Sequence, residues 1–151
     1  MDASTRAVIT AVLAALVAAT AFGQDLPALA QYGRIPVVVA AAVVALLIAV
    51  GWPLLLGLPN LIGSSAVIAL GGIGAVITVT ATRGQPFLRE LPVVVALGIL
   101  LCFVNELARQ DGRTRLVDSV AGSVTGLLVA TAAAGWVGAV RAPDGTALVV
   151  S

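Results

Sequence analysis

The sequence predicts an all-α protein, a polytopic bundle of about five transmembrane helices that forms a single integral membrane domain over residues 1–151. Three observations predict this class. Apolar residues make up 60% of the chain and charged residues 10%, whereas soluble domains hold about 45–50% and about 25%. The apolar residues form long runs, and six of the fifteen charges lie together between Glu106 and Asp118. So few charged residues would cover the surface of a soluble protein poorly. A protein surrounded by hydrocarbon does not need a charged surface.

The apolar runs are interpreted as helices because of their length and pattern. They hold roughly 15 to 24 residues, well beyond the usual strand of about 3–10 residues. They also lack the alternation of polar and apolar residues that strands of a membrane barrel show. In hydrocarbon a helix satisfies its backbone hydrogen bonds within one segment, so these runs are expected to be helical.

The first predicted span, residues 7–22, is short, because a transmembrane helix needs roughly 20 residues. A second interpretation is a signal peptide, since the sequence ATA at residues 19–21 has the form of a cleavage site after an apolar run. The preceding stretch MDASTR carries Asp2 beside Arg6 and fits a signal peptide poorly. Cleavage would leave four spans.

Residues 35–56 and 61–81 form the second and third predicted spans, joined by the uncharged sequence GLPN at residues 57–60. Pro36 lies in the first turn, where the N–H group that proline lacks has no helical partner. Trp52 lies near the other end, and tryptophan is enriched at membrane surfaces. The short connection predicts an antiparallel helical hairpin.

Residues 91–105 and 117–140 form the fourth and fifth predicted spans. The fourth again has a proline in its first turn, and the fifth is closed by Arg141 and by the turn sequence PDG at residues 143–145. The chain then begins another apolar run, TALVVS. This run is either a frayed end or the start of a sixth span of a longer chain.

The charged stretch from Glu106 to Asp118 is predicted to be the loop between the fourth and fifth spans. Water solvates charged side chains in such a loop, whereas each charge at the bilayer centre costs about 2.5–3.5 kcal/mol. We expect the fourth helix to continue to about Gln110 and a turn to follow at Asp111-Gly112. Because short arginine-rich loops stay in the cytoplasm, we expect this loop on the inner side.

Three arginines of this loop are candidate contacts to anionic lipid headgroups: Arg109, Arg113 and Arg115. Such residues add about 1 kcal/mol each near an anionic surface. The alternative, which we favour, is a solvated loop that fixes the topology. The spacing from Glu106 to Arg109, like that from Arg115 to Asp118, also predicts ion pairs.

Small residues recur at every fourth position of the fifth span: Gly122, Gly126, Ala130, Ala134 and Gly138. The third span carries a related group, Gly71, Gly72, Gly74 and Ala75. In lipid, helices associate through close packing, and faces of small residues permit it. The face of the fifth span is therefore predicted to pack helices within one bundle. The alternative is a contact with another subunit.

The sequence holds no catalytic, cofactor-binding or metal-binding constellation. Histidine is absent, and the single cysteine, Cys102, lies in an apolar run. The phosphate-binding glycine loop and the CxxC, HExxH and GxSxG motifs are also absent. The carboxylates of Glu90, Glu106 and Asp118 lie at span ends, within reach of water. Asp118 is the leading candidate for a functional carboxylate, because it enters a helix just before the face of small residues.

The sequence RAPDGTALVV, residues 141–150, follows a polytopic apolar region and resembles the part of bacterial CDP-diacylglycerol synthases that precedes their catalytic motif. That catalytic motif is absent from this chain, so the resemblance implies no site residues. What it implies is a role as the N-terminal membrane part of a lipid-metabolising enzyme.

The function expected from the sequence is that of a small multi-pass protein of a bacterial inner membrane with a non-catalytic accessory or structural role. All eight basic residues are arginine, which together with the abundance of Ala, Val and Gly is typical of GC-rich bacterial genomes. The expected partners are the lipid bilayer and either other membrane subunits or a second copy. The net charge of +1 without a basic stripe indicates no nucleic acid. The alternative is part of a transporter or permease whose path lies between the faces of small residues.

Overall fold

The structure, a computed structural model, describes residues 34–110 and 115–142. These residues form four helices: α3 (Ile35–Leu56), α4 (Leu61–Ala81), α5 (Leu91–Leu107) and α6 (Leu116–Arg141). The helices α3, α4 and α6 are long and apolar enough to cross a membrane, whereas α5, with 17 residues, is shorter. The first predicted span, residues 7–22, lies outside the described residues. The predicted helical class is thus confirmed for the described part, and the count of five spans stays a prediction.

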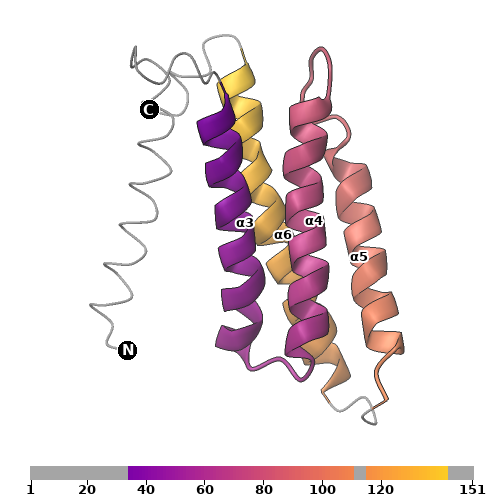
Figure 1. The fold of residues 1–151 in the computed structure, drawn as a ribbon. Coiled ribbons are helices and arrows are strands. Elements are labelled where there is room, and N and C mark those ends of the chain that lie inside the picture. Colours follow the sequence, from indigo (N-terminus) through magenta and orange to yellow (C-terminus); the bar gives the residue numbers. More distant parts are fainter. Residues whose placement is uncertain (1–33, 111–114, 143–151) are drawn as a thin grey trace, which may run out of the picture.

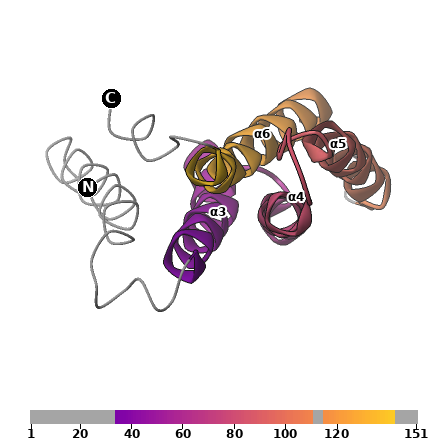
Figure 2. The same cartoon turned by 90° about the horizontal axis from the view of Figure 1, so that it is seen from above.

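The four helices form a bundle in which α4 and α6 lie at the centre and α3 and α5 flank them (Figures 1 and 2). Each of α3 and α5 contacts both central helices, and α4 contacts α6. The helices α3 and α4 form the predicted antiparallel hairpin, and α6 runs in the same direction as α4 (Figure 1). One end of the bundle therefore carries the α3–α4 connection, the end of α5 and the start of α6. We call it the hairpin end.

The α3–α4 connection is tight because the end of α3 and the start of α4 are both capped. Gly57 takes the left-handed conformation, with φ 57°, and its N–H group donates to the main-chain oxygen of Leu54. A side chain at this position would be strained, which explains the glycine. The side-chain oxygen of Asn60 accepts a hydrogen bond of 3.0 Å from the N–H group of Gly63 and so caps the start of α4.

The end of α5 corrects one prediction. The helix ends at Leu107 and not near Gln110. The N–H group of Arg109 donates to the oxygen of Glu106 at 3.3 Å, so the chain tightens into a turn and leaves the helical path. This turn accompanies the pairing of the Arg109 guanidinium with Glu106 inside the bundle. The predicted turn at Asp111-Gly112 lies outside the described residues.

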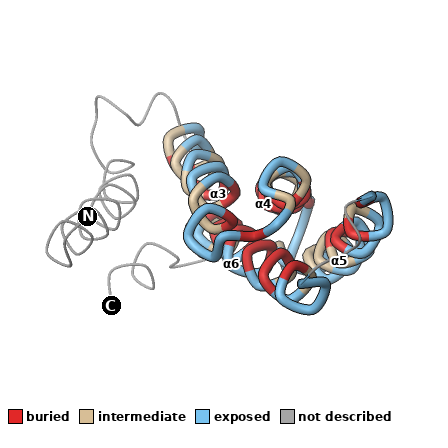
Figure 3. Tube along the Cα trace, turned by 90° about the horizontal axis from the view of Figure 1, so that it is seen from below, coloured by how far each residue is buried: buried red, intermediate tan, exposed pale blue. Residues whose placement is uncertain are grey.

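Small residues fill the centre of the bundle, where buried positions line the inner sides of the helices (Figure 3). On α3 the buried face repeats every four residues: Val37, Ala41, Ala45, Ala49 and Pro53. Gly72 of α4 shows how closely the backbones approach. A Cβ atom added there would lie 3.0 Å from the Cβ of Ala45 on α3 and 3.1 Å from that of Ala130 on α6. Three helices therefore meet at one glycine with only alanine methyl groups between their backbones.

The opposite end of the bundle is held by Arg141 in the last turn of α6. Its guanidinium donates hydrogen bonds to the main-chain oxygens of Thr80 and Thr82, at 3.2 and 2.7 Å, and to that of Val79. It also lies over the ring of Phe87, 4.3 Å from the ring centroid. A cation at the free carbonyls of a helix C-terminus is favourable, so Arg141 ties the end of α6 to the end of α4.

Candidate functional site

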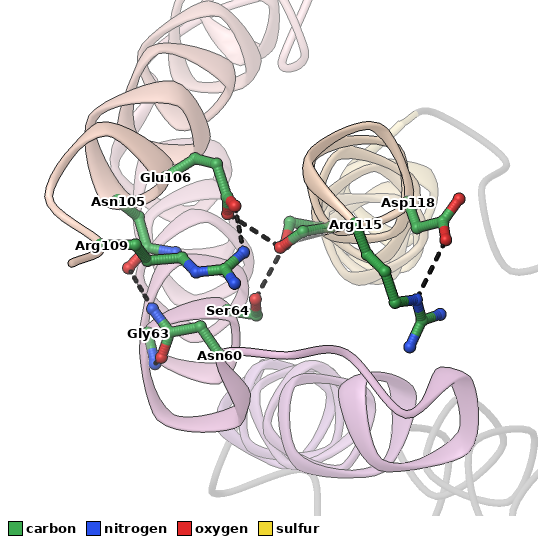
Figure 4. A network of polar contacts seen from close by, with 10 residues as sticks. Asn60, Gly63, Ser64, Asn105, Glu106, Arg109, Arg115 and Asp118 are labelled. Carbon is green, nitrogen blue, oxygen red and sulfur yellow. Dashed lines mark hydrogen bonds and ion pairs between the residues drawn. The ribbon is translucent and has the colours of Figure 1, made fainter. Parts of the chain in front are cut away.

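A buried ion pair lies at the hairpin end of the bundle, between α5 and α6. Glu106, in the last turn of α5, pairs with Arg109, and both side chains are only 4% exposed. The second carboxylate oxygen of Glu106 accepts a hydrogen bond of 2.8 Å from the hydroxyl of Ser119 on α6 (Figure 4). The carboxylate thus links the end of α5 to the first turns of α6.

Further polar contacts extend from this pair towards α4. The hydroxyl of Ser123, one turn after Ser119 on α6, donates to the hydroxyl of Ser64 on α4 at 2.9 Å (Figure 4). On the outer side, the amide of Asn60 donates to the side-chain oxygen of Asn105 at 3.2 Å. Side chains of α4, α5 and α6 therefore make three separate sets of polar contacts at this end, two buried and one, Asn60 with Asn105, partly buried. We call them together the buried polar cluster: Asn60, Ser64, Asn105, Glu106, Arg109, Ser119 and Ser123.

The carboxylate at the centre of the buried polar cluster is satisfied from within the chain. Burying a charge is costly unless a partner and hydrogen bonds compensate it, and Glu106 has both. In the part of the chain that the structure describes, no three His, Cys, Asp or Glu residues lie together as a metal site would require. The arrangement can hold helices in register, because Glu106 on α5 is bonded to Ser119 on α6 and Ser123 on α6 to Ser64 on α4.

One expectation about a polar residue was wrong. Glu106 does not reach water from a span end but is buried, because the turn after α5 brings Arg109 against it. The buried serines Ser119 and Ser123 bond across helices, whereas threonines such as Thr80 and Thr125 bond back to carbonyl oxygens of their own helix. A signal for the burial of Glu106 was present in the sequence. Gly98, Cys102 and Glu106 recur every four residues and form the buried face of α5.

The predicted lipid contacts lie in different surroundings. Arg109 belongs to the buried polar cluster, and its charge faces Glu106 in place of a headgroup. Arg115 is exposed, and its Nε lies 3.1 Å from an oxygen of Asp118, the predicted functional carboxylate. Arg113 lies outside the described residues. Of the two predicted contacts that the structure describes, Arg115 is exposed and Arg109 is buried. Contact between Arg115 and a lipid headgroup stays a prediction.

The predicted helix-packing residues of α6 are all buried: Gly122, Gly126, Ala130, Ala134 and Gly138. Their neighbours belong to the same chain. A Cβ atom added at Gly126 would lie 2.6 Å from atoms of both Ile68 and Trp52, and one added at Gly138 would lie 2.7 Å from Leu88. Since this face is covered within the bundle, a second subunit would have to use another face of α6.

The fold and the site define a class, a small helical bundle with three helices of membrane-spanning length and composition and an ion pair buried at one end. The chain matches no protein-family model, no curated protein and no solved structure. The resemblance of residues 141–150 rests mostly on positions outside the described residues, so the lipid-enzyme interpretation stays a prediction.

Proposed function

We propose that this chain is a small multi-pass protein of a bacterial inner membrane with a non-catalytic accessory or structural role. One observation carries the proposal. The buried side chains of Glu106, Ser119, Ser123 and Ser64 bond to other side chains of the bundle, and the centre is closed by Gly and Ala contacts, so the interior resembles a packed scaffold. A reaction site inside the bundle would need polar groups directed into an open internal space.

The outer surface supports the same role. Large apolar side chains face outward on every described helix, with Leu55 76%, Ile62 86% and Val117 77% exposed. A soluble monomer rarely exposes so many large apolar side chains, whereas lipid or another membrane protein can cover them. The apolar surface thus supports a membrane location and leaves outer faces for partner subunits.

Affinity capture tests the accessory role. We expect the tagged chain, solubilised in a mild detergent, to be recovered in a fixed molar ratio with another membrane protein. The control is a Gly51→Leu variant, because an added Cβ atom at Gly51 would meet nothing within 4 Å. This variant is expected to be recovered with the partner, as the wild type is. Gly72→Leu, which opens the centre of the bundle, is expected to lose the partner. Recovery of the wild-type chain alone, as a monomer, would contradict the accessory role.

A second candidate function is that of a transporter subunit coupled to protons, and Glu106 favours it. Ionisable residues inside membrane bundles are rare and mark proton or ion paths. Glu106 pairs with Arg109 and also accepts the hydroxyl of Ser119 on α6, so its charge bears on the contact between α5 and α6. This coupling of charge to helix packing is what a proton-driven carrier requires.

Proton flux separates the two candidates. The purified chain is placed in liposomes that contain a pH-sensitive dye, and a pH gradient is imposed. The accessory role predicts the same flux as in protein-free liposomes. The transporter predicts a higher flux that falls to the protein-free level in Glu106→Gln and persists in Glu90→Gln, whose carboxylate is half exposed at the other end of the bundle.

A further inference from the structure

A groove at the hairpin end lies beside the buried polar cluster, between the end of α3 and the start of α6. Its lining includes Trp52, Leu56, Leu58, Arg115, Asp118 and Thr125, and its volume is about 500 Å³. This volume is within the range of about 300–1,000 Å³ typical of small-ligand sites. We call it the hairpin-end groove.

The two charged residues of the groove have unused bonding capacity. Nε of Arg115 pairs with one oxygen of Asp118, and its Nη1 donates to the main-chain oxygen of Gly57 at 3.1 Å. Within the described residues, Nη2 of Arg115 and the other oxygen of Asp118 have no hydrogen-bond partner. Both side chains are more than half exposed, at 54% and 60%. The groove therefore offers a cationic donor and an anionic acceptor next to each other (Figure 4).

The remaining lining of the groove is apolar and held in place. The indole N–H group of Trp52 donates to the main-chain oxygen of Gly122 at 3.1 Å, which fixes the ring against α6. Leu56 is exposed and Leu58 is buried against Gly122. Tryptophan prefers the level of the lipid headgroups, where its ring is in apolar surroundings and its N–H group finds a partner. An apolar wall thus adjoins the charged pair, and its tryptophan favours a position at the headgroup level.

From this arrangement we infer that the hairpin-end groove binds a zwitterionic phospholipid whose headgroup ends in a primary ammonium group. The phosphate lies on Arg115, the ammonium group donates to Asp118, and the acyl chain runs along Leu56 and Trp52. This binding site goes beyond the accessory role. It requires only that the hairpin end lies at a bilayer surface.

Charge selects this headgroup among common lipids. An anionic lipid without an amine would pair with Arg115 but would meet the negative charge of Asp118. A choline headgroup has the same net charge as the proposed ligand, but its ammonium group has no N–H bond to donate to the carboxylate. The proposed ligand satisfies both groups through hydrogen bonds between charged partners, which are the strong ones.

Lipid retention tests the inference. The purified full chain is exchanged into an equimolar mixture of phosphatidylethanolamine, phosphatidylcholine and phosphatidylglycerol, and the bound lipid is measured by native mass spectrometry. We expect retention of phosphatidylethanolamine to exceed that of the other two about tenfold, the effect of one hydrogen bond to a charged group. Asp118→Asn should abolish the preference over phosphatidylcholine, and Arg115→Gln should abolish retention of all three.

Two further variants separate the groove from general effects. Ala121→Trp fills the groove and leaves both charges in place, and it should lose the lipid. Arg89→Gln removes the arginine of a comparably exposed ion pair at the opposite end and should keep it. Equal retention of the three lipids, stronger retention of phosphatidylglycerol, or undiminished retention in Ala121→Trp would overturn the inference. Each outcome is independent of whether a partner protein is captured.

Discussion

Replacement of Glu106 by alanine is expected to lower the free energy of unfolding by about 3–5 kcal/mol, the usual effect of removing one partner of a buried ion pair. The side chain of Arg109 is only 4% exposed, so the variant would remove its pairing with the Glu106 carboxylate inside the bundle. Ser119 would also lose its acceptor. Chemical unfolding in mild detergent, followed by circular dichroism, measures the change.

Two matched variants make this prediction specific. The double variant Glu106→Leu/Arg109→Leu removes both buried charges and is expected to unfold close to the wild type, because an apolar pair avoids the desolvation that the ion pair requires. Glu90→Ala disrupts the pair with Arg89, which is about half exposed, and should cost less than about 1 kcal/mol. A Glu106→Ala variant no less stable than Glu90→Ala would contradict the prediction.

Replacement of Gly72 by leucine is expected to destabilise the bundle by about 1–3 kcal/mol or more, as insertion into a packed core does. The first added atom would already lie 3.0 and 3.1 Å from the Cβ atoms of Ala45 and Ala130. These atoms are fixed to their backbones and cannot rotate away, so α3 and α6 would have to move apart from α4. The midpoint of thermal unfolding in detergent is the measurement.

The control for this variant is a glycine with free space around it. A Cβ atom added at Gly51 on α3 would have no neighbouring atom within 4 Å. Gly51→Leu should therefore retain the stability of the wild type or exceed it, because glycine costs a helix about 0.5–1 kcal/mol. If Gly72→Leu unfolds at the same temperature as Gly51→Leu, the three-helix contact does not hold the bundle together.

Most of the secondary structure could be predicted because its signals are local. The apolar runs, the proline in the first turn of α3 and the four-residue connection fix two helices, and the structure gives the predicted bounds 35–56 and 61–81. The spacing of small residues also marked the side of α6 that is buried in the structure. Such patterns need only the period of the helix and the nature of the solvent.

The candidate site could not be predicted to the same extent, because its contacts join distant parts of the chain. Ser64 and Ser123 are 59 residues apart, and Arg115 reaches Gly57 across 58 residues. The charge-rich stretch around Glu106 indicated water, although its spacing from Gly98 and Cys102 marked the buried face of α5. The contact with Ser119 shows that α6 covers this carboxylate. A local pattern reveals which face of a helix is buried and leaves open which helix covers it.

The shortness of α5 has a consequence for the lipids around it. At about 1.5 Å per residue its 17 residues extend about 25 Å, less than the roughly 30 Å of a typical hydrocarbon core, whereas the 26 residues of α6 extend about 39 Å. In a bilayer, this hydrophobic mismatch would thin the leaflets beside α5 but not beside α3. The protein would then deform the bilayer asymmetrically, on the side of α5.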